Sequence, residues 1–172
     1  MTRRAVVLFS LAVFLPSAAS GQTPSGQVAA SALVVNATIT MNTLRNLNFG
    51  QVPSGVPTTV VPTGAAAGEW EAIGTGNAFV QISFTLPTTL SNIQAQPGVT
   101  MPISFSATSA RWRRATNNPA GANVFNPAVG ATGRFGPPPN DRMYVWIGGT
   151  VSPLATQKPG IYLGTVILTL QY

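Results

Sequence analysis

The sequence predicts an all-β protein, an antiparallel β-sandwich, and two observations support that prediction. Fifteen prolines and seventeen glycines interrupt the chain, which is too often for long helices because both residues break or weaken a helix. Between these interruptions, short segments alternate apolar and polar side chains with the period of two that half-buried strands show. Several short strands separated by turn residues are typical of a sandwich of antiparallel sheets.

Residues 1–21 have the layout of a secretory signal peptide. Arg3 and Arg4 precede an apolar run from Ala5 to Leu15, and the helix-breaking Pro16 and small residues follow. The run is short for a membrane span, which needs about 20 apolar residues. We therefore expect cleavage before Gln22, export through the periplasm to the cell surface or the medium, and no transmembrane helix in the mature chain. An uncleaved anchor is the alternative.

The expected strands follow one another along residues 33–172, which we assign to a single sandwich domain. The first strand covers residues 33–41, and its apolar face is Leu33, Val35, Ala37, Ile39 and Met41. The next is "AFVQISFTLP" (78–87), with Val80, Ile82, Phe84 and Leu86 on one face. In "VTMPISFSAT" (99–108) that face is Met101, Ile103 and Phe105. Each alternation predicts a strand with one face in the core.

Two further strands are expected in the second half of the chain. "RMYVWIGGTVS" (142–152) alternates Met143, Val145 and Ile147 with Tyr144 and Trp146. The closing "GIYLGTVILTLQY" (160–172) aligns Tyr162, Val166, Leu168, Leu170 and Tyr172 on one face. Between the two halves, the Gly- and Pro-rich loop from Ala115 to Asp141 has room for a short strand around Asn123–Phe125.

The composition excludes most catalytic and metal sites. The chain has no histidine and no cysteine, so it cannot build a Ser-His-Asp triad, a thiolate nucleophile or the usual zinc site, and no disulfide staples the domain. We therefore predict no catalytic, cofactor-binding or metal-ligating residue, and not an enzyme. Glu69 and Glu71 flank Trp70 and would share one side of a strand. A glycosidase-type pair is the weaker alternative, and a solvated strand edge or turn is the favoured interpretation.

The one cluster of charge is "RWRR", Arg111 to Arg114. Basic side chains around an aromatic ring could grip phosphates while the ring stacks on a base, but a nucleic-acid site normally spreads a basic patch over a whole face. We expect a solvated loop rim, or a contact to a neighbouring subunit or an anionic envelope glycan, and no nucleic acid.

Two stretches carry a resemblance to known families. "LRNLNFGQVPSG" (44–55) and the closing "MYVWIGGTVSP … PGIYLGTVILTLQY" resemble a bacterial exported-domain family of unknown function. Their layout is also similar to spore-coat-U-like and archaic chaperone–usher pilins. The resemblance covers about residues 33–172. It implies that Phe49 and Gly50 mark the turn after the first strand, that Tyr162 and Gly164 open the last strand, and that Tyr172 is its terminal aromatic residue.

The resemblance to pilins also implies how subunits assemble. Such pilins have an incomplete immunoglobulin-like sandwich, and the N-terminal extension of the next subunit supplies the missing strand. An open sheet edge is a template for such an added strand. Here the extension would be residues 22–32, and Val28, Ala30, Ala32 and Val34 alternate as a donor strand should. A flexible tail is the alternative.

These observations lead to one expected function and two alternatives. We expect a structural subunit of a secreted or cell-surface filament, resembling a pilus or a coat. It would associate with copies of itself by donor-strand exchange, with a periplasmic chaperone and an outer-membrane usher as further partners, and without a cofactor. The first alternative is a monomeric exported binding or adhesive module with a complete sandwich and an aromatic patch at Trp70, Trp112 or Trp146. The second is the carbohydrate-active enzyme.

Overall fold

The computed structural model describes residues 38–94 and 99–172, all within one compact unit of the chain, Val34–Tyr172. In this part of the chain there are strands and no helix, and every strand pairing is antiparallel. The all-β antiparallel sandwich is therefore confirmed. The strands are β1 (Thr40–Arg45), β2 (Thr58–Val60), β3 (Gly68–Ile73), β4 (Phe79–Thr85), β5 (Thr89–Asn92), β6 (Thr100–Ser104), β7 (Ala110–Arg114), β8 (Asn123–Phe125), β9 (Ala131–Arg134), β10 (Arg142–Ile147), β11 (Gly149–Val151), β12 (Tyr162–Leu163) and β13 (Ile167–Gln171).

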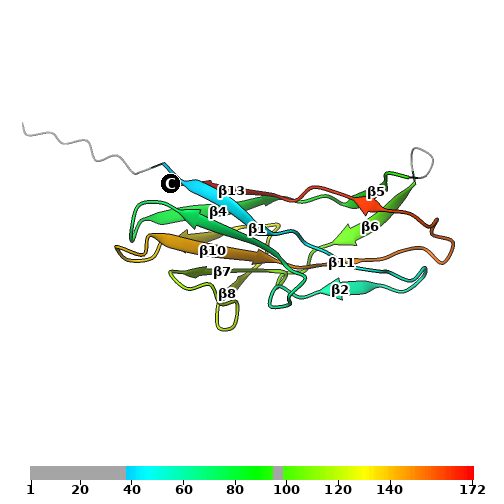
Figure 1. Cartoon of the computed structure of the whole chain (residues 1–172), viewed down its shortest axis with the longest axis horizontal. Coiled ribbons are helices and arrows are strands. Elements are labelled where there is room, and N and C mark those ends of the chain that lie inside the picture. Colours follow the sequence, from blue (N-terminus) through cyan, green and yellow to red (C-terminus); the bar gives the residue numbers. More distant parts are fainter. Residues whose placement is uncertain (1–37, 95–98) are drawn as a thin grey trace, which may run out of the picture. The chain divides into compact units, whose positions relative to one another are not determined.

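The strands form three sheets, in the orders β1-β3-β10-β7-β8, β13-β4-β9 and β12-β5-β6-β11-β2. Successive strands such as β10 and β11 follow each other almost without interruption but belong to different sheets (Figure 1). Gly148 lies at that transition, where a side chain would collide with the carbonyl oxygen of Val60. A glycine is therefore needed where the strand passes from one sheet to the next.

The first two sheets enclose a well-filled core. Apolar side chains from both sheets meet there, and the buried ones include Ala72, Val80, Ile82, Met143, Val145 and Leu168. They come from the alternating positions that the sequence predicts to face inward. This half of the molecule is a closed sandwich of two layers.

The third sheet is covered much less completely. Its buried side chains are Met101, Ile103 and Val151, with Leu90 and Tyr162 only partly buried beside them. No second sheet faces them among the described residues; Phe49 and Val52, from the segment that follows β1, pack against them instead. One half of the sandwich therefore has a thin apolar core.

The first strand differs from its expected bounds. It was expected at residues 33–41, of which residues 33–37 lie outside the described part, whereas β1 runs from Thr40 to Arg45. Pairing with β3 continues this far because Arg45 lies opposite Glu69 and their side chains form an ion pair. The short strand expected at Asn123–Phe125 is confirmed as β8. No helix in the described residues is long and apolar enough to cross a membrane.

Candidate functional site

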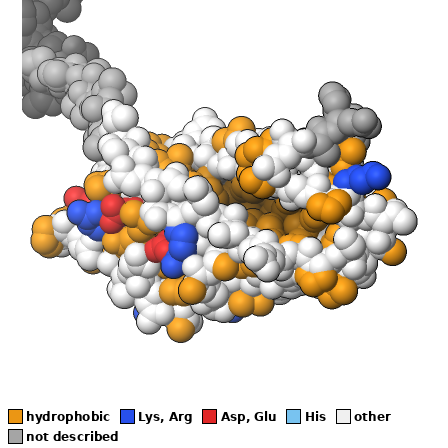
Figure 2. Space-filling model, turned by 45° about the vertical axis from the view of Figure 1, so that its right-hand side comes forward, with side chains coloured by type: hydrophobic (Ala, Val, Ile, Leu, Met, Phe, Trp, Pro, Cys, Tyr) orange, Lys and Arg blue, Asp and Glu red, His pale blue; other side chains and the backbone are white. Residues whose placement is uncertain are grey.

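A groove with a volume of about 1090 Å³ lies in the described part of the molecule. Its two walls are the segment 45–54 that follows β1 and the segment 157–166 that leads through β12 to β13. Figure 2 shows apolar side chains at the bottom of this hollow. We call it the groove below.

The floor of the groove is apolar and comes from several strands. Leu90 on β5, Met101 and Ile103 on β6, and Val151 on β11 line it from the third sheet, and Trp70 lines it from β3. Ile103 is 7% exposed and Val151 is fully buried. Because a sheet is stable only when its apolar face is covered, these side chains form the face on which a further layer would pack.

The walls of the groove are segments that continue from strands at sheet edges. β1 and β12 are each the last strand of their sheet, and so is β13, which continues the second wall. In the segment after β1, the N–H of Asn48 donates to the carbonyl of Ala66, 3.0 Å away. An outer edge presents backbone N–H and C=O groups that a further strand can pair with. The groove thus combines an apolar floor with the open edges of two sheets.

A hydrogen-bonded cluster around Gln157 fixes one end of the groove. The Gln157 side-chain amide donates to the Tyr162 hydroxyl, 2.6 Å away, and to the carbonyl of Thr100, 3.1 Å away. The Tyr162 hydroxyl in turn donates to the carbonyl of Lys158, 2.7 Å away. Tyr162 is therefore held in place while its ring packs against the groove floor.

The residues predicted for the last strand divide between the core and the groove. Leu168 is 5% exposed and Leu170 is half-buried, and both pack into the closed core. Tyr162 and Val166 line the groove instead. Tyr172 anchors the other end of the strand, because its hydroxyl accepts a hydrogen bond from the N–H of Thr75 (2.6 Å) and its ring lies 6.0 Å from that of Phe135.

The predicted turn residues lie at the groove walls. Phe49 and Gly50 follow β1 and line the first wall. Gly50 has a φ of +67°, which favours glycine, and its N–H donates to the Asn48 side chain, 2.9 Å away. Gly164 lies between β12 and β13, where a Cβ would come within 2.6 Å of Leu90. The donor-strand candidates Val28, Ala30, Ala32 and Val34 lie outside the described residues.

The groove carries little charge. Among the residues that the structure describes, Arg45 and Lys158 are the two charged ones that line it, and no carboxylate does. The guanidinium of Arg45 pairs with Glu69 at 2.6 Å. An uncharged, apolar segment therefore suits the groove better than a charged one, because a buried charge without a partner is costly.

Glu69 and Glu71 occupy a central strand, not the solvated strand edge or turn that the sequence favoured. β3 lies between β1 and β10, and Glu69 is 6% exposed. Glu71 accepts hydrogen bonds from Arg142 at 2.5 Å and from Tyr144 at 2.8 Å. Burial raises the pKa of Glu71, but these hydrogen bonds and the charge of Arg142 outweigh it, so the pKa lies below its ordinary value. Both carboxylates are thus engaged in structural ion pairs.

The arginine cluster also differs from its expected place. Arg111, Arg113 and Arg114 belong to strand β7, not to a loop rim. The side chains of Arg111 and Arg113 donate to carbonyls of the loop after β7, at Pro119 (3.2 Å) and Ala120 (2.7 Å) respectively. Of the three tryptophans, Trp70 lines the groove, Trp112 is half-buried beside β8, and Trp146 is fully buried against Tyr144. They do not form one patch.

Sequence reasoning missed the groove floor as a site. The alternation predicts Met101 and Ile103 only as inward-facing strand residues, and it includes Val151 only in the strand segment 142–152. It shows which side chains face inward but not whether a second layer covers them. Within residues 38–94 and 99–172, no three His, Cys, Asp or Glu side chains lie close enough together to hold a metal ion. A comparison with protein-family models found no match for this chain, and a comparison with curated proteins found no significant match.

Proposed function

We propose that this protein is a structural subunit of a secreted or cell-surface filament in which the groove of one copy receives a β-strand from another copy. The observation that carries the proposal is the groove itself, with its apolar floor between the outer edges of two sheets. A donated strand would provide backbone partners for the edges and apolar side chains for the floor. The sandwich would then be immunoglobulin-like and complete only in the assembly.

The N-terminal extension is the best candidate for the donated strand. From Gln22 to Leu44 the chain has no charged residue, which matches a groove without carboxylates. Val28, Ala30, Ala32 and Val34 would point to the floor while the residues between them point away. Residues 22–37 can extend over about 50 Å at about 3.3 Å per residue, so the segment is long enough to follow a groove wall.

The strand is donated between copies rather than within one. To fill its own groove, the extension would have to fold back beside β1 through a tight turn close to Thr40. The sequence "VVNATIT" (34–40) has no glycine or proline, and Asn36 is its only strong turn former, so the segment favours an extended course over a tight turn. Extension into a neighbouring groove requires no turn.

Export and assembly partners belong to the same proposal. Before assembly, the groove would stay unfilled, with the half-buried Trp70, Leu90 and Tyr162 along it in contact with water, and exposed apolar surface leads to aggregation. A periplasmic chaperone that covers the groove and an outer-membrane usher that releases subunits in order would solve this problem. The proposal assigns no catalysis: Glu69 and Glu71 form ion pairs with Arg45 and Arg142, whereas a glycosidase needs a carboxylic acid that can donate a proton.

Cysteine cross-linking tests the proposal cleanly because the chain has no native cysteine. Leu90→Cys places a thiol on the groove floor, and Val28, Ala30 or Ala32 is changed to Cys in the same chain. We expect oxidation to yield covalent ladders of subunits on non-reducing gels. The matched controls carry Ala29→Cys or Ser31→Cys, whose side chains would point away from the floor, and should yield mostly single chains. Equal linking in both sets, or no linking between chains, would contradict strand donation.

A further inference from the structure

The cations of the described residues are distributed unevenly with respect to the acids. Arg45 and Arg142 form ion pairs with Glu69 and Glu71. The other five cations, Arg111, Arg113, Arg114, Arg134 and Lys158, have no carboxylate partner within residues 38–94 and 99–172. Four of these five lie on β7 and β9, which are neighbours in the fold. This side of the sandwich is therefore positively charged and suits an anionic partner.

The arginines of β7 have two different roles. Arg111 and Arg113 point to the loop after β7, and Arg113 donates to the carbonyls of both Asn118 (3.3 Å) and Ala120 (2.7 Å). Arg114 is exposed, and its side chain has no hydrogen-bond or ion-pair partner in the described part of the chain. Its guanidinium therefore keeps all five N–H donors for a ligand.

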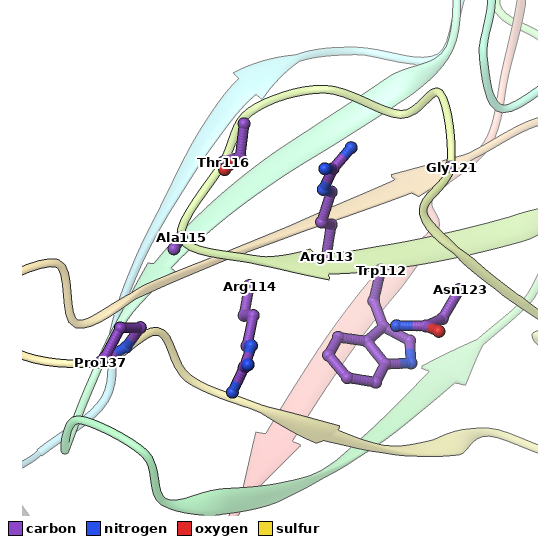
Figure 3. A pocket seen from close by; sticks show the side chains of 8 residues that line it. All are labelled: Trp112, Arg113, Arg114, Ala115, Thr116, Gly121, Asn123 and Pro137. Carbon is purple, nitrogen blue, oxygen red and sulfur yellow. The ribbon is translucent and has the colours of Figure 1, made fainter.

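A notch lies beside Arg114, where β8 stops. β8 pairs with β7 only from Ala110 to Trp112, so the last two residues of β7 extend past it. The notch has a volume of about 450 Å³, within the range of about 300–1,000 Å³ that is usual for small-ligand sites. Figure 3 shows Trp112, Asn123 and Arg114 on one side of β7, and Arg113 on the opposite side, toward the loop. The notch thus brings together an aromatic ring, an amide and a free guanidinium.

We propose that this notch binds an acidic saccharide. The carboxylate of a uronic acid residue would accept two parallel hydrogen bonds from Arg114, the geometry that a guanidinium favours. Trp112 packs against the closed core and also lines the notch, so the apolar face of the sugar ring would pack against the part of its indole that is left at the notch. Ring hydroxyls would bond to the Asn123 amide. Each of these three side chains suits a different part of one sugar residue.

A saccharide fits the notch better than a nucleic acid. Binding to a nucleic-acid backbone needs several cations spread along a track, whereas here two of the three β7 arginines are already bonded to their own loop. The notch shares no lining residue with the groove. The inference therefore does not rest on the proposed strand donation, and either can fail without the other.

Calorimetry with the mature chain, Gln22–Tyr172, tests the inference with tetragalacturonate as the probe. We expect binding that weakens as salt is added and no binding of the neutral β-1,4-galactotetraose. Arg114→Ala should weaken binding by about tenfold or more, as expected for the loss of charge-assisted hydrogen bonds. Arg114→Lys should recover only part of the affinity, because lysine keeps the charge but loses the paired geometry. The matched control is Lys158→Ala, which removes an unpaired cation at the groove and should leave the affinity unchanged.

Three results would overturn the inference. The first is no binding of tetragalacturonate at millimolar concentration by a chain whose unfolding shows that it is folded. The second is an equal loss of affinity in Lys158→Ala and Arg114→Ala, which would show attraction by net charge alone. The third is tighter, Arg114-dependent binding of a single-stranded oligonucleotide such as oligo-dT, which would make the notch a phosphate and base site.

Discussion

A pair of isoleucine truncations tests whether the groove is open in the single subunit. Ile82 is 2% exposed in the closed core, and Ile103 is 7% exposed on the floor of the groove. Both are buried isoleucines on β-strands, so Ile82→Ala and Ile103→Ala remove the same atoms. The two substitutions differ in their surroundings, because the space left by Ile82→Ala lies inside the closed core and the space left by Ile103→Ala lies next to the groove.

The two substitutions should lower the free energy of unfolding by different amounts. Each removes three carbon atoms, and the lost transfer free energy is about 2.4 kcal/mol at about 0.8 kcal/mol per carbon. At Ile82 the truncation also leaves an enclosed cavity of about 80 Å³, which adds about 2 kcal/mol. At Ile103 the space opens into the groove and fills with water, so the second contribution is lost. We therefore expect the free energy of unfolding to fall by about 4 kcal/mol in Ile82→Ala and by about 2 kcal/mol in Ile103→Ala.

Urea unfolding of a chain of residues 22–172, kept monomeric by dilution, measures both free-energy losses from the shift in the urea midpoint at constant slope. A synthetic peptide of residues 22–34 is then added in excess. By filling the groove, the peptide should increase the loss in free energy of unfolding caused by Ile103→Ala toward that caused by Ile82→Ala. The loss caused by Ile82→Ala should stay unchanged. Equal costs in the dilute monomer, or no effect of the peptide on Ile103→Ala, would refute the reasoning.

Two further predictions concern the fold itself. Glu71→Gln should lower the free energy of unfolding at pH 7 by about 1–2 kcal/mol, because charge-assisted hydrogen bonds are lost. Since the pKa of Glu71 is lowered from its ordinary value of 4.5, this stabilisation is present above pH 4.5 and disappears as the pH falls through the folded-state pKa; thermal melts from pH 7 to pH 2 should show the two proteins converging. Gly148→Ala should cost about 1–3 kcal/mol, because the new methyl group would overlap the carbonyl of Val60. The control Gly50→Ala has open space and should cost only about 1 kcal/mol for its positive φ; urea unfolding that ranks the two in the opposite order would contradict this account.

The sequence predicted the strands that alternate clearly, because that signal is local, but it predicted no strand at β2, β5, β7 or β9. Alternation along one strand identifies the faces of residues such as Val80, Ile82 and Leu168, and the structure buries all three. Even the short β8 could be predicted inside a long loop, because Asn123–Phe125 interrupts a run of turn residues.

What the sequence could not predict depends on which strands become neighbours. The positions of Glu69 and Glu71 in a central strand follow from β3 pairing with both β1 and β10, segments far away in the chain. The groove likewise exists because β1 and β12 end their sheets without a partner among the described residues. An unpaired edge leaves no local pattern, since its residues alternate just as those of a paired strand do. The arginines of β7 were predicted on a loop rim for a related reason. A run of charged residues favours a loop in the sequence alone, and the carbonyl groups that bind Arg111 and Arg113 belong to a loop whose position only the fold determines.

The most direct measurement of the central claim is a mixing experiment with two single-cysteine chains. Both chains consist of residues 22–172; one carries only Ala30→Cys and the other only Leu90→Cys, so neither can form an internal disulfide. Strand donation between copies predicts a covalent product of one chain of each kind after oxidation, formed only in the mixture and absent when Ser31→Cys replaces Ala30→Cys. The account would be contradicted if the mixture gave no such product while the chain with both Ala30→Cys and Leu90→Cys formed an internal link as a monomer.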